Sequence, residues 1–328
     1  MKKLFIMAAM ATFLLCGATG AFAATKLRIA GNFPTDHSSS LAMELFKEKV
    51  AEYSKGDITV DTFPAMQLGG ASENVDQVRS GSIFATWISI AYLSRTVPEL
   101  EAVSLPFVFT SREQAFQVVD GDVGKLLDQK LADKRFTSLG YMELGFRHLT
   151  NSKRAINTID DFKGLKIRLQ PNETHLETFR AIGASPISMD IQEVYQALQQ
   201  GVLDGQENPY AVSQSRNFNE IQKYLTNTGH FFDFIIIAAN KRAYERFTPE
   251  QKAAIDKAMA EAIAWQRKKA ADDDEICRQA LIKGGMEFNA VTPELIKEMQ
   301  TRTKPIIEQV SKKVGADLVN SVLRQAGM

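Results

Sequence analysis

The sequence offers little material for disulfide or metal chemistry. It contains two cysteines, and Cys16 lies in an N-terminal segment that we expect to be removed, which leaves Cys277 alone. A mature chain with one cysteine cannot form an intramolecular disulfide, so its stability must come from a packed core. The four histidines are far apart in the chain, at His37, His148, His175 and His230. These spacings match no compact metal motif, and we expect neither a metal site nor a cofactor.

Catalytic signatures are missing as well. The chain lacks G-x-S-x-G, H-E-x-x-H, a P-loop and G-x-G-x-x-G, and Cys277 lies in a charged segment without a nearby histidine. Such motifs supply the nucleophile, base, metal or phosphate cradle of many enzymes. We therefore expect a protein that is not an enzyme.

An excess of either charge is also absent. Removing the two lysines of the N-terminal segment leaves 37 basic residues against 39 acidic ones, a net charge of −2. Nucleic acids and anionic membrane surfaces attract proteins with a clear positive excess, so we expect neither as a partner. The sequence instead favours a small-molecule ligand and a monomer.

Long hydrophobic runs are confined to the N-terminus. Two lysines precede a mostly apolar stretch at 4–15, and residues 21–23 read Ala-Phe-Ala, the A-x-A form of a cleavage site. This pattern predicts a signal peptide over residues 1–23 and a periplasmic location. Cys16 leaves lipid attachment as an alternative, which the bulky leucine before it disfavours. No other segment approaches the ~20 apolar residues of a membrane-spanning helix.

What the chain does contain is a unit of alternating strands and helices that occurs twice. In the first unit, strands at 27–31, 58–63 and 82–89 alternate with helices at 41–53 and 72–80. In the second, strands at 165–169, 185–189 and from 202 alternate with helices at 174–182 and 191–200. Gly81 and Gly201 end the last helix of each unit, where a left-handed backbone is expected. The pattern predicts an α/β protein with two similar lobes.

The remaining segments are predicted to join and brace these lobes. Two apolar stretches, 137–150 and 228–239, are expected to be long strands that cross between the lobes, and 249–282 a long bracing helix. We assign 24–144 plus 233–272 to lobe I, 145–232 plus 273–300 to lobe II, and 301–328 to a C-terminal helical brace. Ligands of open α/β sheets bind at the carboxyl ends of strands, so we expect a ligand cleft between the lobes.

Polar residues at predicted strand ends are the candidate ligand contacts. Arg168 closes a strand before a loop that holds Gln170 and Asn172, and its guanidinium matches a carboxylate with two parallel hydrogen bonds. Asn208 ends a short strand, and Arg147 lies on a crossing strand. An ordinary surface ion pair for Arg168 and a turn-forming role for Asn208 remain the alternative interpretations.

Three longer segments carry a resemblance to a known family: Gly145 to Asn151 (GFRHLTN), Asp161 to Arg168 (DFKGLKIR) and Asp204 to Pro209 (DGQENP). They resemble the solute-binding proteins of TRAP transporters, of the C4-dicarboxylate-binding type. The resemblance implies a two-lobed fold like that of periplasmic binding proteins, which closes on a ligand in the cleft between the lobes. It further implies that Arg168 is the main partner of the ligand carboxylate and that Arg147 and Asn208 complete the contacts. It also implies a membrane permease of small and large subunits, driven by an ion gradient.

Other residues are expected to select the rest of the ligand. The resemblance points to the first loop and the first-lobe helix, which here offer Asn32, His37 and Glu73. Aromatic surface comes from Phe33, Trp87, Tyr92 and Phe232, although aromatic residues on strands are often core.

Asp233 complicates the choice of ligand. If its carboxylate faces the cleft, it opposes an anionic ligand unless that ligand also carries an ammonium group. A sugar acid or similar polar monocarboxylate is our first hypothesis, and an amino, peptide-like or aromatic keto acid is the alternative. A periplasmic enzyme or a ligand-sensing subunit on the same scaffold is the alternative of another class.

Overall fold

A single mixed sheet organises the molecule. The computed structural model describes residues 24–328, and the predicted signal peptide lies outside them. Neighbouring strands follow the order β2-β1-β3-β8-β4-β7-β5-β6, with β9 pairing along β8. The strands are β1 (Thr25–Gly31), β2 (Ile58–Phe63), β3 (Ala85–Ser89), β4 (Phe136–Asn151), β5 (Lys166–Leu169), β6 (Ser185–Ser188), β7 (Gly205–Asn208), β8 (Tyr224–Asn240) and β9 (Glu287–Ala290). The predicted α/β fold is confirmed.

The two longest strands, β4 and β8, join the two halves of this sheet. They pair in antiparallel fashion from Phe136 opposite Asn240 to Asn151 opposite Tyr224. We call β1, β2 and β3 with their helices the first half, and β5, β6 and β7 with theirs the second half. The register of β4 and β8 shifts near Gly145, whose φ of 113° belongs to the left-handed region that favours glycine. The two crossing strands expected from the sequence are therefore present.

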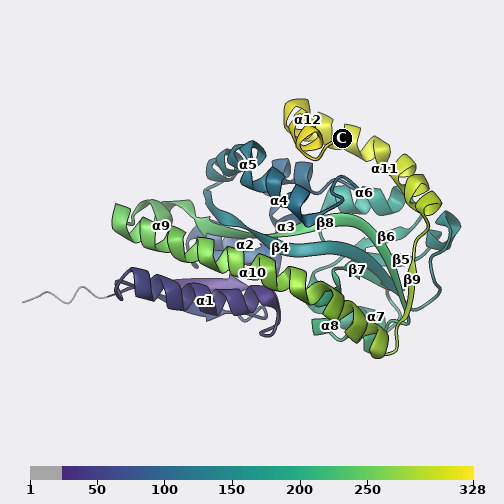
Figure 1. Cartoon of the computed structure of the whole chain (residues 1–328), viewed down its shortest axis with the longest axis horizontal. Coiled ribbons are helices and arrows are strands. Elements are labelled where there is room, and N and C mark those ends of the chain that lie inside the picture. The colour runs from purple at the N-terminus through teal and green to yellow at the C-terminus, as the bar shows by residue number, and fades with distance from the viewer. Residues whose placement is uncertain (1–23) are drawn as a thin grey trace, which may run out of the picture.

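Helices cover both faces of the sheet (Figure 1). The helices are α1 (Ser38–Tyr53), α2 (Ala71–Ser80), α3 (Ile90–Leu93), α4 (Arg112–Asp120), α5 (Asp122–Asp133), α6 (Glu173–Ala181), α7 (Ile191–Gln199), α8 (Tyr210–Ser215), α9 (Lys241–Glu245), α10 (Pro249–Lys283), α11 (Pro293–Val314) and α12 (Ala316–Gln325). Three short 3-10 helices are η1 (Pro98–Val103), η2 (Ile159–Phe162) and η3 (Phe218–Glu220). The repeated strand–helix unit is present, and Gly81 and Gly201 have φ of 85° and 71° at the ends of α2 and α7. No helix within 24–328 is long and apolar enough to cross a membrane.

The long helix α10 braces the sheet. Oγ1 of Thr248 accepts a hydrogen bond from the backbone amide of Gln251, and Oε1 of Gln251 accepts one from the backbone amide of Thr248, so the predicted cap forms. The helix packs against α1, crosses β4 and reaches α8, and in Figure 1 it runs across the face of the molecule. It thus contacts elements of both halves.

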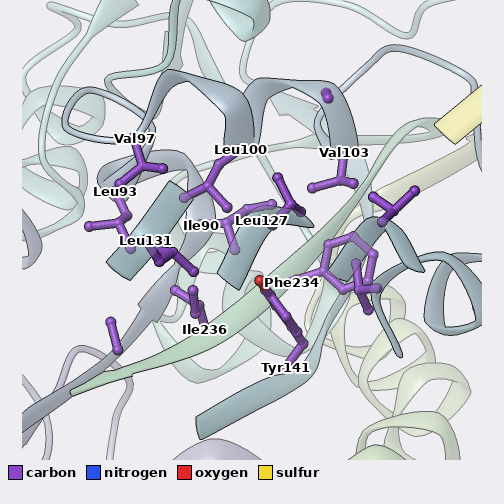
Figure 2. Packing of buried hydrophobic residues seen from close by; sticks show 14 of the residues in the cluster. Ile90, Leu93, Val97, Leu100, Val103, Leu127, Leu131, Tyr141, Phe234 and Ile236 are labelled. Carbon is purple, nitrogen blue, oxygen red and sulfur yellow. The ribbon is translucent and has the colours of Figure 1, made fainter. Parts of the chain in front are cut away.

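The hydrophobic core lies on both faces of β8, because successive side chains of a strand point to opposite sides. Phe234 and Ile236 face a cluster that includes Ile90, Leu127 and Tyr141, shown in Figure 2. On the opposite face, Ile235 and Ile237 pack in a cluster with residues of α1 and α10. A third cluster under the second half contains Ile167, Leu169, Phe162 and Phe179. Both faces of the crossing strands are therefore covered.

Candidate ligand-binding site

Strand β7 is short and polar, yet all of its residues are buried. It pairs with β4, so that Leu149 lies opposite Glu207 and His148 opposite Asn208. Gly205 permits this close approach, because a Cβ at that position would lie 2.2 Å from the carbonyl oxygen of Thr150. The strand pairing places Glu207 and Asn208 beside the side chain of Arg147.

Arg147 is the centre of a buried ionic cluster. Its Nε lies 2.5 Å and its Nη2 2.8 Å from the two carboxylate oxygens of Glu207. Nη1 donates to Asp233 over 2.9 Å, and Nη2 donates to Oδ1 of Asn208 over 3.0 Å. The Nε2 atom of His230 lies 3.1 Å from Glu207. Most hydrogen-bonding capacity of this guanidinium is therefore taken by the protein itself.

The two acids of this cluster respond differently to burial. Burial favours the neutral form of Glu207, but the charge and hydrogen bonds of Arg147 outweigh it and hold the pKa of Glu207 far below its usual range. Burial raises the pKa of Asp233, and Arg147 and Ser89 compensate only in part. Glu207 is consequently the principal counter-ion of Arg147.

Asp233 is not a free carboxylate. Besides Arg147, it accepts a hydrogen bond from Ser89 Oγ over 2.8 Å and one from the amide of Phe234. The same Ser89 hydroxyl lies 3.2 Å from Oε1 of Gln170. The carboxylate that complicated the choice of ligand is already neutralised by a protein cation, so it does not require an ammonium group on the ligand.

Arg168 differs from Arg147 because part of its guanidinium has no partner. Its side chain is fully buried. Nε donates to the carbonyl of Met189 over 2.8 Å, and Nη2 donates to the hydroxyl of Tyr92 over 3.0 Å. Nη1 is buried and has no hydrogen-bond acceptor among residues 24–328. A buried, charged donor without an acceptor is costly, and it matches an oxygen of a bound anion.

Asn172 is a predicted ligand contact, but its side-chain amide makes hydrogen bonds within the protein. Its Oδ1 caps α6 by accepting from the amide of His175 over 3.0 Å. Its Nδ2 donates to Oγ of Ser94 over 2.9 Å. The residue holds α6 and connects the segment after β3 to the second half.

Several such hydrogen bonds link the two halves around Arg168. They join Tyr92 to Arg168, Ser89 to Gln170, Ser94 to Asn172, Glu101 to Thr174 and Asn32 to Arg216. All of the first-named residues lie in the first half or in the segment between β3 and α4. The unpartnered nitrogen of Arg168 therefore lies at the junction of the halves.

Asn32 and Glu73 are connected through a line of side-chain amides in the first half. Nδ2 of Asn32 lies 3.5 Å from Oδ1 of Asn74, whose Nδ2 donates to Gln77 over 3.2 Å. Nε2 of Gln77 donates to Glu73 over 3.2 Å. Oδ1 of Asn32 is buried and has no donor within 24–328. Glu73 is thus linked to Asn32 only through the side chains of Asn74 and Gln77.

His37 and Phe33 form a stacked pair at the start of α1. Their ring centroids are 4.6 Å apart, and Nδ1 of His37 accepts from the amide of Ser39 over 3.2 Å. Burial lowers the pKa of His37 to about 3, with a further contribution from the charge of Arg216. His37 is therefore a neutral helix cap.

Trp87 and Phe232 lie within the hydrophobic clusters. Trp87 is fully buried, and its ring centroid is 6.2 Å from that of Phe46. Phe232 packs edge to face with Phe109, Phe146 and Phe234. Both rings contribute to packing, while Nε1 of Trp87 has no acceptor among the described residues.

Four residues of this region were not identified as polar contacts from the sequence. They are Ser89, Tyr92, Glu207 and Arg216. A signal existed for Glu207, because Gln206, Glu207 and Asn208 are consecutive polar residues in a predicted strand, and a buried polar strand requires internal partners. No metal-binding group of three or more His, Cys, Asp or Glu side chains occurs within 24–328.

Known proteins are similar to this chain in fold and in sequence. A family model described as bacterial extracellular solute-binding protein, family 7 (DctP), matches residues 29–313. The sugar acid binding protein DctPAm of Advenella mimigardefordensis, solved in complex with galactonate, is 32% identical, with a TM-score of 0.90 over 93% of this chain and 98% of that chain. The 2,3-diketo-L-gulonate-binding periplasmic protein YiaO of Escherichia coli is 32% identical over 93% of each chain.

A relative with a different named ligand is also similar. The C4-dicarboxylate-binding periplasmic protein DctP of Rhodobacter capsulatus is 30% identical over 84% of each chain. The family resemblance expected from the three sequence segments is thereby confirmed. The chain belongs to the DctP family of solute-binding proteins, which serve TRAP transporters.

Proposed function

We propose that this protein captures a sugar acid in the periplasm and delivers it to a membrane permease. The observation that carries the proposal is the buried Nη1 of Arg168, which has no acceptor within 24–328 and lies where the halves meet. A carboxylate oxygen supplies the missing acceptor. A hydrogen bond to a charged group contributes about 1.5–3 kcal/mol when water is excluded.

The state of Asp233 supports a sugar acid over an amino acid. An ammonium group is recognised by a free carboxylate, but Asp233 is held by Arg147 and Ser89. The galactonate and diketogulonate bound by two of the relatives support the same class. A C4-dicarboxylate is the second candidate, because the relative from Rhodobacter capsulatus is named for it.

We further propose that the two halves move as lobes. Lobe I comprises 24–144 plus 233–272, lobe II comprises 145–232 plus 273–300, and 301–328 braces them. The hydrogen bonds between Tyr92 and Arg168 and between Ser94 and Asn172 support closure at this junction. Closure excludes water from Arg168. Arg147 and Asn208 each keep one donor hydrogen that the cluster does not use, on Nη1 and on Nδ2, and these complete the contacts to the ligand.

The biological setting follows from the family. We infer a cleaved signal peptide over 1–23, a monomer in the periplasm, and small and large integral membrane subunits of a TRAP permease as partners. Binding without turnover fits a transport component. A periplasmic enzyme or a sensing subunit on this scaffold would be distinguished by conversion of the bound acid or by a receptor partner.

A thermal-shift screen tests the proposal. The mature chain is heated with galactonate, glucuronate, succinate, pyruvate and glutamate, and a ligand that binds only the native state raises the melting temperature. We expect the largest shift from a sugar acid. Arg168→Lys should abolish most of that shift because an ammonium cannot reproduce the planar guanidinium. Arg180→Lys, an exposed arginine on α6, is the matched control. An unchanged shift in Arg168→Lys would overturn the site.

A further inference from the structure

Besides Nη1 of Arg168, two further buried polar atoms at the junction of the halves have no hydrogen-bond partner among residues 24–328. Arg216 directly follows α8, and its Nη2 donates to the backbone carbonyl of Asn32 over 2.9 Å. Nε of Arg216 is buried without an acceptor, and Oδ1 of Asn32 is buried without a donor, among residues 24–328. The hydrogen bond between the two residues places both unpartnered groups at one contact. One is only a donor and the other only an acceptor.

The orientation of the Asn32 amide is fixed by its neighbours. Asn74 donates from Nδ2 to the carbonyl of Leu68 over 3.0 Å and to Gln77 over 3.2 Å, so its Oδ1 is the acceptor that faces Asn32. Nδ2 of Asn32 therefore points to Asn74. Its Oδ1 is left without a donor among residues 24–328.

We propose that Asn32 and Arg216 form a recognition point for a hydroxyl group of the bound acid. The proposal rests on the sugar-acid function above and narrows it. A hydroxyl accepts from Nε of Arg216 and donates to Oδ1 of Asn32 at the same time. A second carboxylate has no proton for Asn32, and an ammonium group has no lone pair for Arg216. The pair thus selects hydroxylated acids against dicarboxylates and amino acids.

Arg216 and Arg168 are neighbouring buried cations, and each has one buried nitrogen without an acceptor among residues 24–328. Burial, together with the nearby positive charge of Arg168, lowers the pKa of Arg216. The carboxylate of the ligand belongs at Arg168, where Nη1 is free. The hydroxyl belongs at Arg216, so the two arginines recognise different groups of one molecule.

Calorimetry with deoxy analogues tests this assignment. The probe is D-galactonate, or whichever sugar acid of the screen binds most tightly, together with the set of its monodeoxy analogues. In the wild type, one analogue should bind roughly tenfold to a hundredfold more weakly than the parent acid, because it leaves buried groups unpaired. In Arg216→Met and in Asn32→Ala, the parent and that analogue should bind with nearly equal affinity.

The two variants separate recognition from structure. Asn32→Ala keeps the backbone carbonyl that holds Arg216, and it removes the acceptor together with the contact to Asn74. A purely structural role of Arg216 would weaken all ligands equally and leave the ratio between parent and analogue unchanged. Arg79→Met, an exposed arginine on α2, is the control and should keep the wild-type ratio.

Three outcomes contradict the inference. Wild-type ratios in both variants would overturn it, as would equal binding of every monodeoxy analogue to the wild type, which would indicate that water alone fills this position. Both results leave sugar-acid binding itself intact. Failure of every sugar acid to bind the wild type would instead contradict the proposed function, and the inference with it.

Discussion

The hydroxyl of Tyr92 lies 3.0 Å from Nη2 of Arg168, so a residue that follows β3 in the first half holds the guanidinium of a β5 residue in the second half. The carbonyl of Met189 holds Nε of the same guanidinium over 2.8 Å. These two contacts fix the plane of the guanidinium and leave Nη1 as the free donor. Preorganisation of this kind lowers the entropy that a ligand must lose on binding.

Tyr92→Phe should therefore weaken sugar-acid binding without changing the fold. The variant keeps the ring in its hydrophobic cluster and removes only the hydroxyl. Loss of a hydrogen bond to a charged group costs about 1.5 kcal/mol, or roughly tenfold in the dissociation constant. Isothermal titration with galactonate measures the effect. Tyr195→Phe, whose hydroxyl bonds to Glu220 on the surface, should bind as the wild type does. Equal affinities for the two variants would contradict a role for Tyr92 in positioning Arg168.

The buried cluster of Arg147 predicts unequal effects for its two acids. Glu207→Gln removes the main counter-ion of Arg147, and breaking a buried pair costs about 3–5 kcal/mol in the free energy of unfolding. Asp233→Asn should cost less, because burial raises the pKa of Asp233 and the amide can still accept from Arg147. Urea denaturation of both variants gives the two free energies. A larger loss for Asp233→Asn would show that Glu207 is not the principal counter-ion.

The tight contact between β7 and β4 predicts that Gly205→Ala is strongly destabilising. The added methyl group would lie 2.2 Å from the carbonyl oxygen of Thr150 and 2.8 Å from Cβ of Asn151, so the strands must separate. Separation would move Glu207 and Asn208 away from Arg147. Gly56→Ala has open space and carries only the strain of a positive φ, of about 1 kcal/mol. Comparable melting temperatures for these variants would show that β7 tolerates a side chain at this position.

Local patterns in the sequence are sufficient to predict most of the long helices and strands. The crossing strands, the helix that begins at Thr248 and the helix ends at Gly81 and Gly201 follow from alternation, caps and glycine, which act over a few residues. We predict no helix or strand between β3 and β4 from the sequence. There α3 and η1 are too short to show a helical period. The helix α5 does show one, because Val123, Leu127 and Leu131 recur every fourth residue, so its sequence pattern could have predicted it.

The site was predictable only in part, because its contacts join distant residues. Arg147, Arg168 and Asn208 stand out by residue type and by their positions at strands. The partner of Arg168 is Tyr92, 76 residues away, and that of Asn32 is Arg216, 184 residues away. No local pattern pairs them. The sequence indicates only an aromatic surface at Tyr92, because the hydrogen bond of its hydroxyl to Arg168 exists only where the two halves of the fold meet.

Buried histidines predict a loss of stability in mild acid. Burial lowers the pKa values of His37, His148 and His175 to about 3, whereas an unfolded histidine titrates near pH 6.5. Between pH 6.5 and 3 the unfolded state binds more protons than the native state, so the free energy of unfolding rises with pH in this window. At pH 5 each histidine should cost about 2 kcal/mol relative to pH 7. The raised pKa of Asp233 acts in the opposite direction.

His37→Asn isolates one of these contributions. Asparagine can still cap α1 in place of the histidine nitrogen, but it does not titrate. The variant should lose about 2 kcal/mol less than the wild type between pH 7 and pH 5, as measured by urea denaturation at each pH. Asp36→Asn, at the neighbouring exposed position, is the control and should show the wild-type pH dependence. Identical pH profiles for His37→Asn and the wild type would mean that His37 is protonated in the native state, which is incompatible with its Nδ1 accepting from the amide of Ser39.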